Sequence, residues 1–203
     1  MLRMLKLTRA KSLIALLLCI CLTCMLCSCA PDITLDEVKA VLPELVDSSK
    51  VLNNIYFGEG FEIDGANSDV EKSGGYYCCD TEKYGLNSIL EIKEATEKVY
   101  TKEYADILYG AAFDGLTTDT VVKAPRFVEG EKGLMQRASD EKYDIKDREF
   151  DYDSLAIKKS GNKRVTVTVD TYVDGEKDET LEIIVVRLGS EGDYSYRLDS
   201  PTY

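Results

Sequence analysis

The spacing of apolar residues changes along this chain from the period of a helix to the period of a strand. Residues 35–55 repeat apolar side chains about every 3.6 positions, as one face of an amphipathic helix does. From Asp151 onward, apolar and polar residues alternate, and turn signals at 160–163, 174–175 and 189–193 separate the segments. Helices first and a sheet last predict the α+β class, with N-terminal helices packed on a curved C-terminal antiparallel meander.

Three hydroxyl residues, Thr34, Ser88 and Thr101, stand where helix caps are expected. Thr34 and Ser88 are each followed three positions later by a glutamate, which is the pattern of a capping box. We therefore expect three helices that begin after these caps, the second of them ending at Val99. Pro43 lies inside the first helical pattern, so we expect a kink or a restart there.

The rest of the chain divides into a loop and strands. Residues 57–75 contain five glycines and five carboxylates and predict a long loop, from which a short strand over 75–79 leads out. Within the meander, the alternate valines of 164–173 are expected to face inward. The strand over 180–188 is apolar on both faces, which predicts a central strand or one that a helix covers.

The first 28 residues have the composition of a secretory signal peptide. Basic residues and no acidic ones precede an apolar stretch over 13–22, which is too short to span a membrane comfortably. A few residues later stands Leu26-Cys27-Ser28-Cys29, which resembles the bacterial lipobox, the motif whose cysteine becomes lipidated. An ordinary cleaved signal peptide, or a start anchor rich in cysteine, is the alternative.

This resemblance implies a division of the chain into three parts. We expect a lipoprotein signal peptide over 1–28, a lipid anchor on Cys29 with a short tether over 29–33, and a single α+β domain over 34–203. The implied location is the cell membrane, with the domain lipid-anchored and facing outside the cytoplasm. Four residues separate Cys29 from the first cap, so we expect the domain to lie close to the bilayer.

The net charge narrows the choice of partners. Loss of 28 of the 203 residues leaves 175, and the four basic residues that are lost change the net charge from −12 to −16. Such a negative chain is a poor partner for nucleic acid, and we do not expect it to lie flat on an anionic lipid surface. It suits a cationic partner, such as a basic envelope protein, although scattered acidic residues are more often a solvated surface.

The absence of histidine excludes the Ser-His-Asp and Cys-His catalytic groups and histidine-ligated zinc. After Cys29 the chain holds only two cysteines, the adjacent Cys78 and Cys79, which we expect to be unpaired thiols facing opposite sides of a strand. We expect no metal, no cofactor and no catalytic residue. The alternative in the enzyme class is a cell-wall hydrolase that uses two carboxylates.

Two acidic groups and a set of tyrosines are the remaining candidates for a site. Neither acidic group has the spacing of a calcium-binding loop, so we expect a solvated edge and a solvated turn. The tyrosines are expected mostly to pack, with a binding face as the alternative. These residues are Asp147, Glu149, Asp151 and Asp153; Asp174, Glu176, Asp178 and Glu179; and Tyr76, Tyr77, Tyr194, Tyr196 and Tyr203.

The predicted order of elements resembles the NTF2-like (cystatin-like) fold, in which a curved sheet wraps a helix and leaves a conical pocket. Two segments also look like parts of secreted Gram-positive proteins that inhibit cell-wall DL-endopeptidases, and a third, at the end of the chain, looks like the last strand of such lipoproteins. The segments are Tyr84-Gly85-Leu86-Asn87-Ser88-Ile89-Leu90-Glu91-Ile92-Lys93, Val99-Tyr100-Thr101-Lys102-Glu103-Tyr104 and Tyr196-Arg197-Leu198-Asp199-Ser200-Pro201-Thr202-Tyr203. No motif in them is tied to inhibition, so the resemblance assigns no ligand-binding residue.

Together these observations predict a non-catalytic, lipid-anchored binding module. It would dock an envelope protein, with inhibition of a wall peptidase as one case, or a small ligand. A structural lipoprotein without a ligand is the alternative within the same class.

Overall fold

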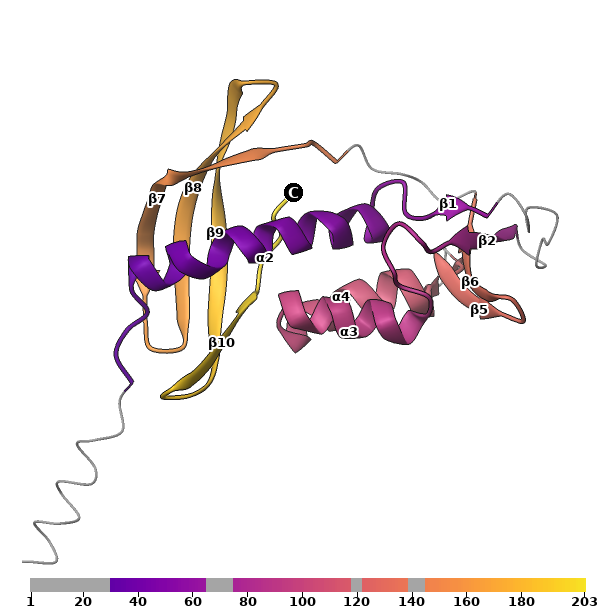
Figure 1. Ribbon diagram of the computed structural model, residues 1–203, viewed down its shortest axis with the longest axis horizontal. Helices are drawn as coiled ribbons and strands as arrows, with labels where there is room; N and C mark the ends of the chain where they lie inside the picture. Colours follow the sequence, from indigo (N-terminus) through magenta and orange to yellow (C-terminus); the bar gives the residue numbers. More distant parts are fainter. Residues whose placement is uncertain (1–29, 65–74, 118–121, 139–144) are drawn as a thin grey trace, which may run out of the picture. The chain divides into compact units, whose positions relative to one another are not determined.

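The computed structural model describes residues 30–64, 75–117, 122–138 and 145–203 (Figure 1). The expected signal peptide and Cys29 lie outside the described residues, as does most of the expected loop after Asp64. Residues 33–203 form one compact unit. Within the described parts, no helix combines the length and the apolarity that crossing a membrane requires.

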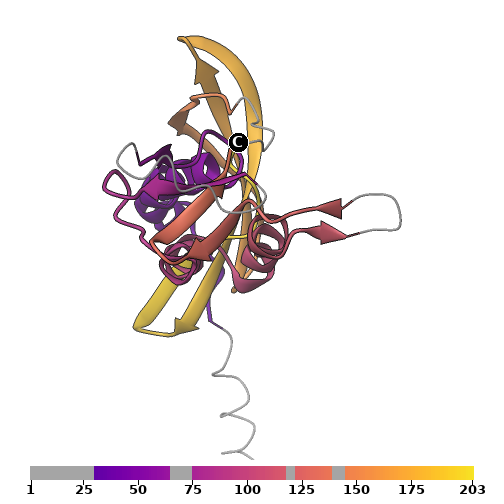
Figure 2. The ribbon, with the colours of Figure 1, turned by 90° about the vertical axis from the view of Figure 1, so that its right-hand side faces the viewer.

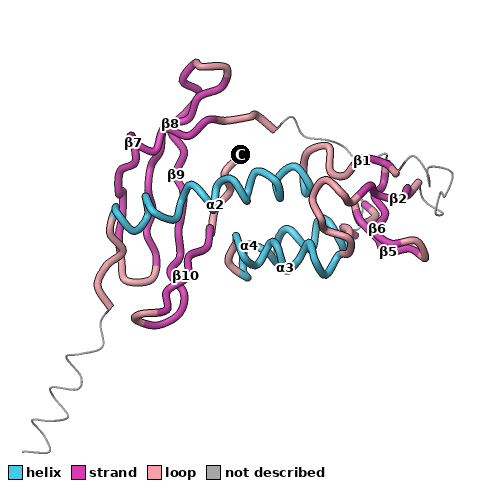
Figure 3. The backbone as a smooth tube through the Cα atoms, viewed as in Figure 1, coloured by secondary structure: helices cyan, strands magenta, loops and turns pink. Residues whose placement is uncertain are grey.

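The described residues have mixed helix and antiparallel sheet, which confirms the α+β class (Figure 3). The chain begins with the long helix α2 (Leu35–Tyr56). The remaining elements are β1 (Glu62–Ile63), β2 (Tyr76–Asp80), α3 (Ile89–Val99), α4 (Lys102–Tyr109), a π-helical turn (Gly110–Asp114), β3 (Leu116–Thr117), β4 (Val122–Lys123), β5 (Phe127–Gly130), β6 (Gly133–Arg137), β7 (Glu149–Ser160), β8 (Arg164–Val173), β9 (Glu176–Ser190) and β10 (Asp193–Leu198).

The capping box at the start of α2 is confirmed. The backbone N–H of Thr34 donates to Glu37 Oε2 at 2.7 Å, and the N–H of Glu37 donates to Thr34 Oγ1 at 3.3 Å. The expected restart at Pro43 is wrong, because α2 continues through it. Proline removes the donor for the carbonyl four residues earlier, but that carbonyl belongs to Lys39, an exposed position where water can reach it.

The other two caps differ in completeness. Ser88 caps α3 and Thr101 caps α4, as expected. The second capping box is only half formed, because the carboxylate of Glu91 accepts from Asn87 at its backbone N (2.5 Å) and Nδ2 (3.2 Å) instead of from the cap residue. The carboxylate of Glu91 therefore bonds Asn87 and not the backbone N–H of Ser88, as a complete capping box would require.

The C-terminal strands form one antiparallel sheet in the order β10-β9-β8-β7. β8 has the predicted bounds, and Val165, Val167 and Val169 are fully buried. β9 lies between β8 and β10, which confirms the central position expected from its two apolar faces. This sheet, α2, α3 and α4 enclose the main apolar core.

A second, smaller sheet was not expected from the sequence. Its order is β1-β2-β6-β5. The strand predicted over 75–79 is found as β2, one residue later at each end, and it pairs with β6, more than 50 residues further along the chain. β1 lies inside the segment predicted to be a loop, which corrects that prediction at residues 62–63. β3 and β4 form a separate two-stranded ribbon that extends away from the other elements (Figure 2).

The start of the compact unit is fixed to the β7–β8 turn. Ile33 is buried, its backbone N donates to Gly161 O at 3.0 Å, and its carbonyl accepts from Ser160 Oγ at 2.7 Å. Nearby, Glu37 Oε1 accepts from Arg187 (3.2 Å) and from the Tyr196 hydroxyl (2.9 Å), which ties α2 to β9 and β10.

A buried polar group connects the C-terminal half of α2 to the residues after β10. Asn53 Nδ2 donates to Thr202 Oγ1 at 3.0 Å, and Asn53 Oδ1 accepts from the Tyr100 hydroxyl at 3.0 Å. Ser49 shares a 2.7 Å hydrogen bond with the same threonine. Burial raises the pKa of Tyr100 to about 12, so its hydroxyl keeps the proton that it donates.

Candidate functional site

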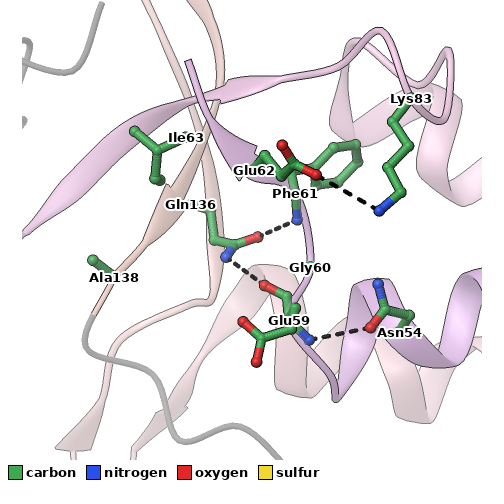
Figure 4. Close-up of a pocket in the computed structure, with 9 residues that line it drawn as sticks. All are labelled: Asn54, Glu59, Gly60, Phe61, Glu62, Ile63, Lys83, Gln136 and Ala138. Carbon is green, nitrogen blue, oxygen red and sulfur yellow. Dashed lines mark hydrogen bonds and ion pairs between the residues drawn. The ribbon is translucent and has the colours of Figure 1, made fainter. Parts of the chain in front are cut away.

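A pocket of about 470 Å³ lies at the C-terminal end of α2, against β1 and β6 (Figure 4). Since a helix rises about 1.5 Å per residue, the 22 residues of α2 place this end roughly 33 Å from Ile33. The volume is within the range of small-molecule sites. The lining residues are Asn54, Glu59, Gly60, Phe61, Glu62, Ile63, Lys83, Gln136 and Ala138.

The wall of this pocket is built around the side-chain amide of Gln136. Its Oε1 accepts from the backbone N of Phe61 at 2.9 Å, and its Nε2 donates to Glu59 O at 3.1 Å. Gly60 between them has φ +74°, and a Cβ there would lie 2.1 Å from Gln136 Oε1. Only glycine allows the backbone to pass this close to the amide.

The side chain of Arg126, which is buried, also holds the backbone of this wall. Its guanidinium donates to Gly58 O at 2.6 Å and lies 5.6 Å from the centroid of the Phe127 ring. The segment that leaves α2 is thus held by side chains of β6 and of the residue before β5. The chain from Gly58 to Phe61 forms a fixed wall.

The rim of the pocket combines charge with apolar surface. Lys83 Nζ lies 3.7 Å from Glu62 Oε1, with both side chains exposed, and the Ile63 side chain is 38% exposed. Beneath the rim, the Phe61 ring packs edge-on against Tyr84, whose hydroxyl accepts from Asn54 Nδ2 at 2.8 Å. This arrangement can bind a ligand that has an apolar part and a polar end.

A smaller pocket of about 160 Å³ lies between α2, the start of β7 and Thr202. Its cationic rim is already paired, since Lys50 contacts Asp147 at 3.3 Å and Lys146 contacts Asp178 at 2.6 Å. This pocket therefore offers a ligand less space and fewer available charges than the one at the end of α2.

The two acidic groups partly come together. β7 pairs with β8 and β8 with β9, so Asp178 and Glu179 lie beside the residues that lead into β7. There the buried guanidinium of Arg148 donates to Asp178 Oδ2 at 2.9 Å and also to Glu179. Glu179 remains exposed, as expected of a solvated turn, whereas Asp178 is partly buried, and both carboxylates balance a buried cation.

No group of three or more metal-ligating side chains occurs among the described residues. Instead, hydrogen bonds from Lys146 and Arg148 lower the pKa of Asp178. The pKa of Asp170 is lowered by Lys177 and Thr180, and that of Glu37 mainly by the backbone of Thr34. A hydrolase needs a general acid whose pKa is raised, so these three carboxylates are shifted in the wrong direction for that role.

The two adjacent thiols are unpaired and differ in burial, with Cys78 buried and Cys79 half-buried. Burial raises the pKa of Cys79 to about 12. A thiol in this state is almost fully protonated at neutral pH, so it is a poor nucleophile and a poor metal ligand.

The tyrosines make packing and hydrogen-bonding contacts. The Tyr76 hydroxyl donates to Pro125 O at 2.5 Å, the Tyr194 ring lies 4.4 Å from the Arg187 guanidinium carbon, and Tyr196 bonds Glu37. Tyr203 is partly exposed and packs on Phe57. Tyr77 is half-buried on β2.

Sequence reasoning missed Arg126, Gln136 and Lys83, which shape the pocket. Their roles depend on the pairing of β2 with β6, for which the sequence has no local signal. The glycines at 58 and 60 were the available hint, because both stand where a Cβ would meet a neighbour at 2.4 Å or less. No protein-family model, no curated protein and no solved structure matches this chain.

Proposed function

We propose that this protein is a lipid-anchored extracytoplasmic binding module, held on the cell membrane through lipid on Cys29. The observation that carries the proposal is the order of basic segment, short apolar stretch and Leu26-Cys27-Ser28-Cys29. The hydrogen bonds of Ile33 to the β7–β8 turn support it, because only three residues then separate Cys29 from a fixed point of the domain.

The binding site that we propose is the pocket at the far end of α2. Its wall is fixed by Gln136 and Arg126, and its rim combines the exposed Ile63 with charged side chains. The occupant is a small ligand or a projecting segment of an envelope protein. The strongly negative charge of the chain favours a cationic partner, since complementary charge speeds encounter.

The anchor is tested by replacing Cys29 with serine in the full chain. We expect the wild-type chain to incorporate labelled fatty acid and to remain with the membrane fraction. The Cys29→Ser chain should do neither. Unchanged labelling and retention of the variant would contradict lipidation at this residue.

The pocket is tested by capture of envelope components with the membrane-anchored chain after cross-linking, at low and at high salt. Ile63→Arg places a charge at the rim, and Ile157→Arg on β7 is a matched control because the two side chains are 38% and 39% exposed. We expect Ile63→Arg alone to abolish capture, and high salt to weaken it. Equal capture by both variants would exclude the pocket, and no capture by any chain would leave a structural lipoprotein.

The same proposal assigns the domain no hydrolytic activity of its own. The chain has no histidine, and the carboxylates with shifted pKa values are all shifted downward in the described residues. Release of fragments from purified peptidoglycan is the test. Turnover that is lost on changing one carboxylate would favour the hydrolase instead.

A further inference from the structure

The β7–β8 turn is a basic segment in an acidic chain. Residues 158–164 contain Lys158, Lys159, Lys163 and Arg164 and no acidic residue, and no other stretch of seven residues after Cys29 holds four basic side chains. The chain after Cys29 carries a net charge of −16. A local excess of positive charge on such a background gives this turn a potential opposite to that of the molecule as a whole.

Two of these four charges have no partner within the described parts of the chain. Lys158 pairs with Glu182 and Arg164 pairs with Asp199. Lys159 and Lys163 are exposed and make no ion pair with any described residue. The ammonium groups of Lys159 and Lys163 are therefore available to bind an anionic partner outside the described part of the chain.

The turn is also the place where the chain arrives from Cys29. Ile33 is held by Ser160 and Gly161 at the centre of the turn, through bonds of 2.7 Å and 3.0 Å. Four residues of extended chain span at most about 14 Å. A lipid on Cys29 thus keeps the turn within about 14 Å of the bilayer surface, which is less than twice the range of about 8 Å over which charges attract in physiological salt.

We infer that the β7–β8 turn docks on anionic lipid headgroups of the membrane that holds the chain, through Lys159 and Lys163. This inference rests on the proposed lipid anchor at Cys29. The neighbouring β9–β10 turn carries the exposed Glu191 and Asp193, so the contact is confined to the β7–β8 turn. Attraction at this turn and repulsion of the acidic remainder keep the start of α2 next to the bilayer.

This contact has a consequence for the proposed binding site. α2 runs from Ile33 to the pocket, and its 22 residues extend roughly 33 Å. The β7–β8 turn and the pocket therefore lie at opposite ends of α2, so contact of the turn with lipid leaves the pocket open to an envelope partner.

Acylation of surface lysines tests the docking directly. The lipidated full chain is added to preformed vesicles of phosphatidylcholine alone, or of phosphatidylcholine mixed equally with phosphatidylglycerol, and flotation first verifies anchoring. In the anionic vesicles we expect labelling of Lys159 and Lys163 to slow about fivefold, which corresponds to about 1 kcal/mol for one lysine at such a surface. Labelling of Lys98, an exposed lysine on α3, should not change, and high salt should restore the labelling of the turn.

A charge reversal supplies the matched variant. Lys163→Glu should remove most of the protection of Lys159, whereas Lys98→Glu, with the same change in net charge, should leave it intact. Equal labelling of the turn in both kinds of vesicle, in a chain that floats with them, overturns the docking surface and leaves the anchor standing. A chain that does not float overturns the anchor, and this docking surface with it.

Discussion

The two sheets of this protein, at opposite ends of α2, are built in different ways. The C-terminal sheet has strands of 6 to 15 residues, and each strand pairs with the next one along the chain. The small sheet has strands of 2 to 5 residues, and it joins β2 to β6 across α3 and α4. Local pairing of long strands is therefore confined to one end of α2.

The side chains that hold the two sheets differ accordingly. The C-terminal sheet is held by fully buried aliphatic residues such as Val167 and Ile183. The small sheet has a smaller buried apolar cluster of Tyr76, Cys78 and Met135, and hydrogen bonds from Gln136 and Arg126 hold the backbone of residues 58–61 beside it. Regions with few buried apolar contacts open at a lower free energy than the core. We therefore expect the C-terminal sheet to be a stable platform, and the small sheet, which carries the proposed binding pocket, to open at a lower free energy.

The largest effect is expected from a change in the core of the C-terminal sheet. Ile183→Ala removes a fully buried side chain from the central strand β9, which should lower the free energy of unfolding by about 2–5 kcal/mol. Ile184→Ala on the same strand removes a half-buried side chain and should cost clearly less. Urea unfolding followed by circular dichroism measures both, and equal losses would contradict the assignment of the core to one face.

The next effect concerns the joint between α2 and the residues after β10. Asn53→Ala removes the acceptor of the buried Tyr100 hydroxyl and leaves Thr202 Oγ1 with Ser49 as its remaining partner, which should cost about 1–3 kcal/mol. In a double-mutant cycle with Tyr100→Phe, the two losses should add to more than the loss in the double variant. Strict additivity would mean that the asparagine does not bind this tyrosine.

A third substitution tests whether the small sheet opens independently of the C-terminal sheet. Gln136→Met keeps the length of the side chain but removes the hydrogen bonds to Phe61 N and Glu59 O. Amide hydrogen exchange should become faster at Phe61 and in β6, while β8 and β9 keep their protection. Faster exchange throughout the molecule would show that the small sheet and the large one unfold together.

The same contrast explains how much of the structure the sequence could predict. The bounds of β8 and the caps of three helices follow from local patterns, because alternation, turn residues and hydroxyl caps act over a few positions. The small sheet could not be predicted, since its strands are too short for a period to develop and its partners lie far apart. The wall formed by Gln136 was missed for the same reason.

Charge shows a related limit of sequence reasoning. The acidic residues at the β8–β9 turn were identified, but their pattern predicted a solvated turn. Arg148, which two of them contact, lies 30 residues before Asp178 and is buried only because the start of β7 folds against this turn. A sequence gives the number of charges, whereas their pairing follows from the strand register.

The smallest effect is expected from pH, and it concerns this ion pair. Since Lys146 and Arg148 lower the pKa of Asp178 in the folded protein, the carboxylate stabilises the fold above the ordinary carboxyl pKa of about 4. That stabilisation is lost as the pH falls through the lowered value, because the unfolded chain takes up the proton first. Asp178→Asn should therefore reduce the fall in the urea midpoint below pH 4.

Glu176→Gln is the matched control, because it changes an exposed carboxylate on the same hairpin that makes no ion pair with any described residue. Its acid profile should follow that of the wild type. Because Glu179 still contacts Arg148 in Asp178→Asn, the variant should remain folded at neutral pH with only a small loss. If both variants had the wild-type acid profile, the charges at this turn would contribute nothing to the platform, and its stability would come from the buried aliphatic residues alone.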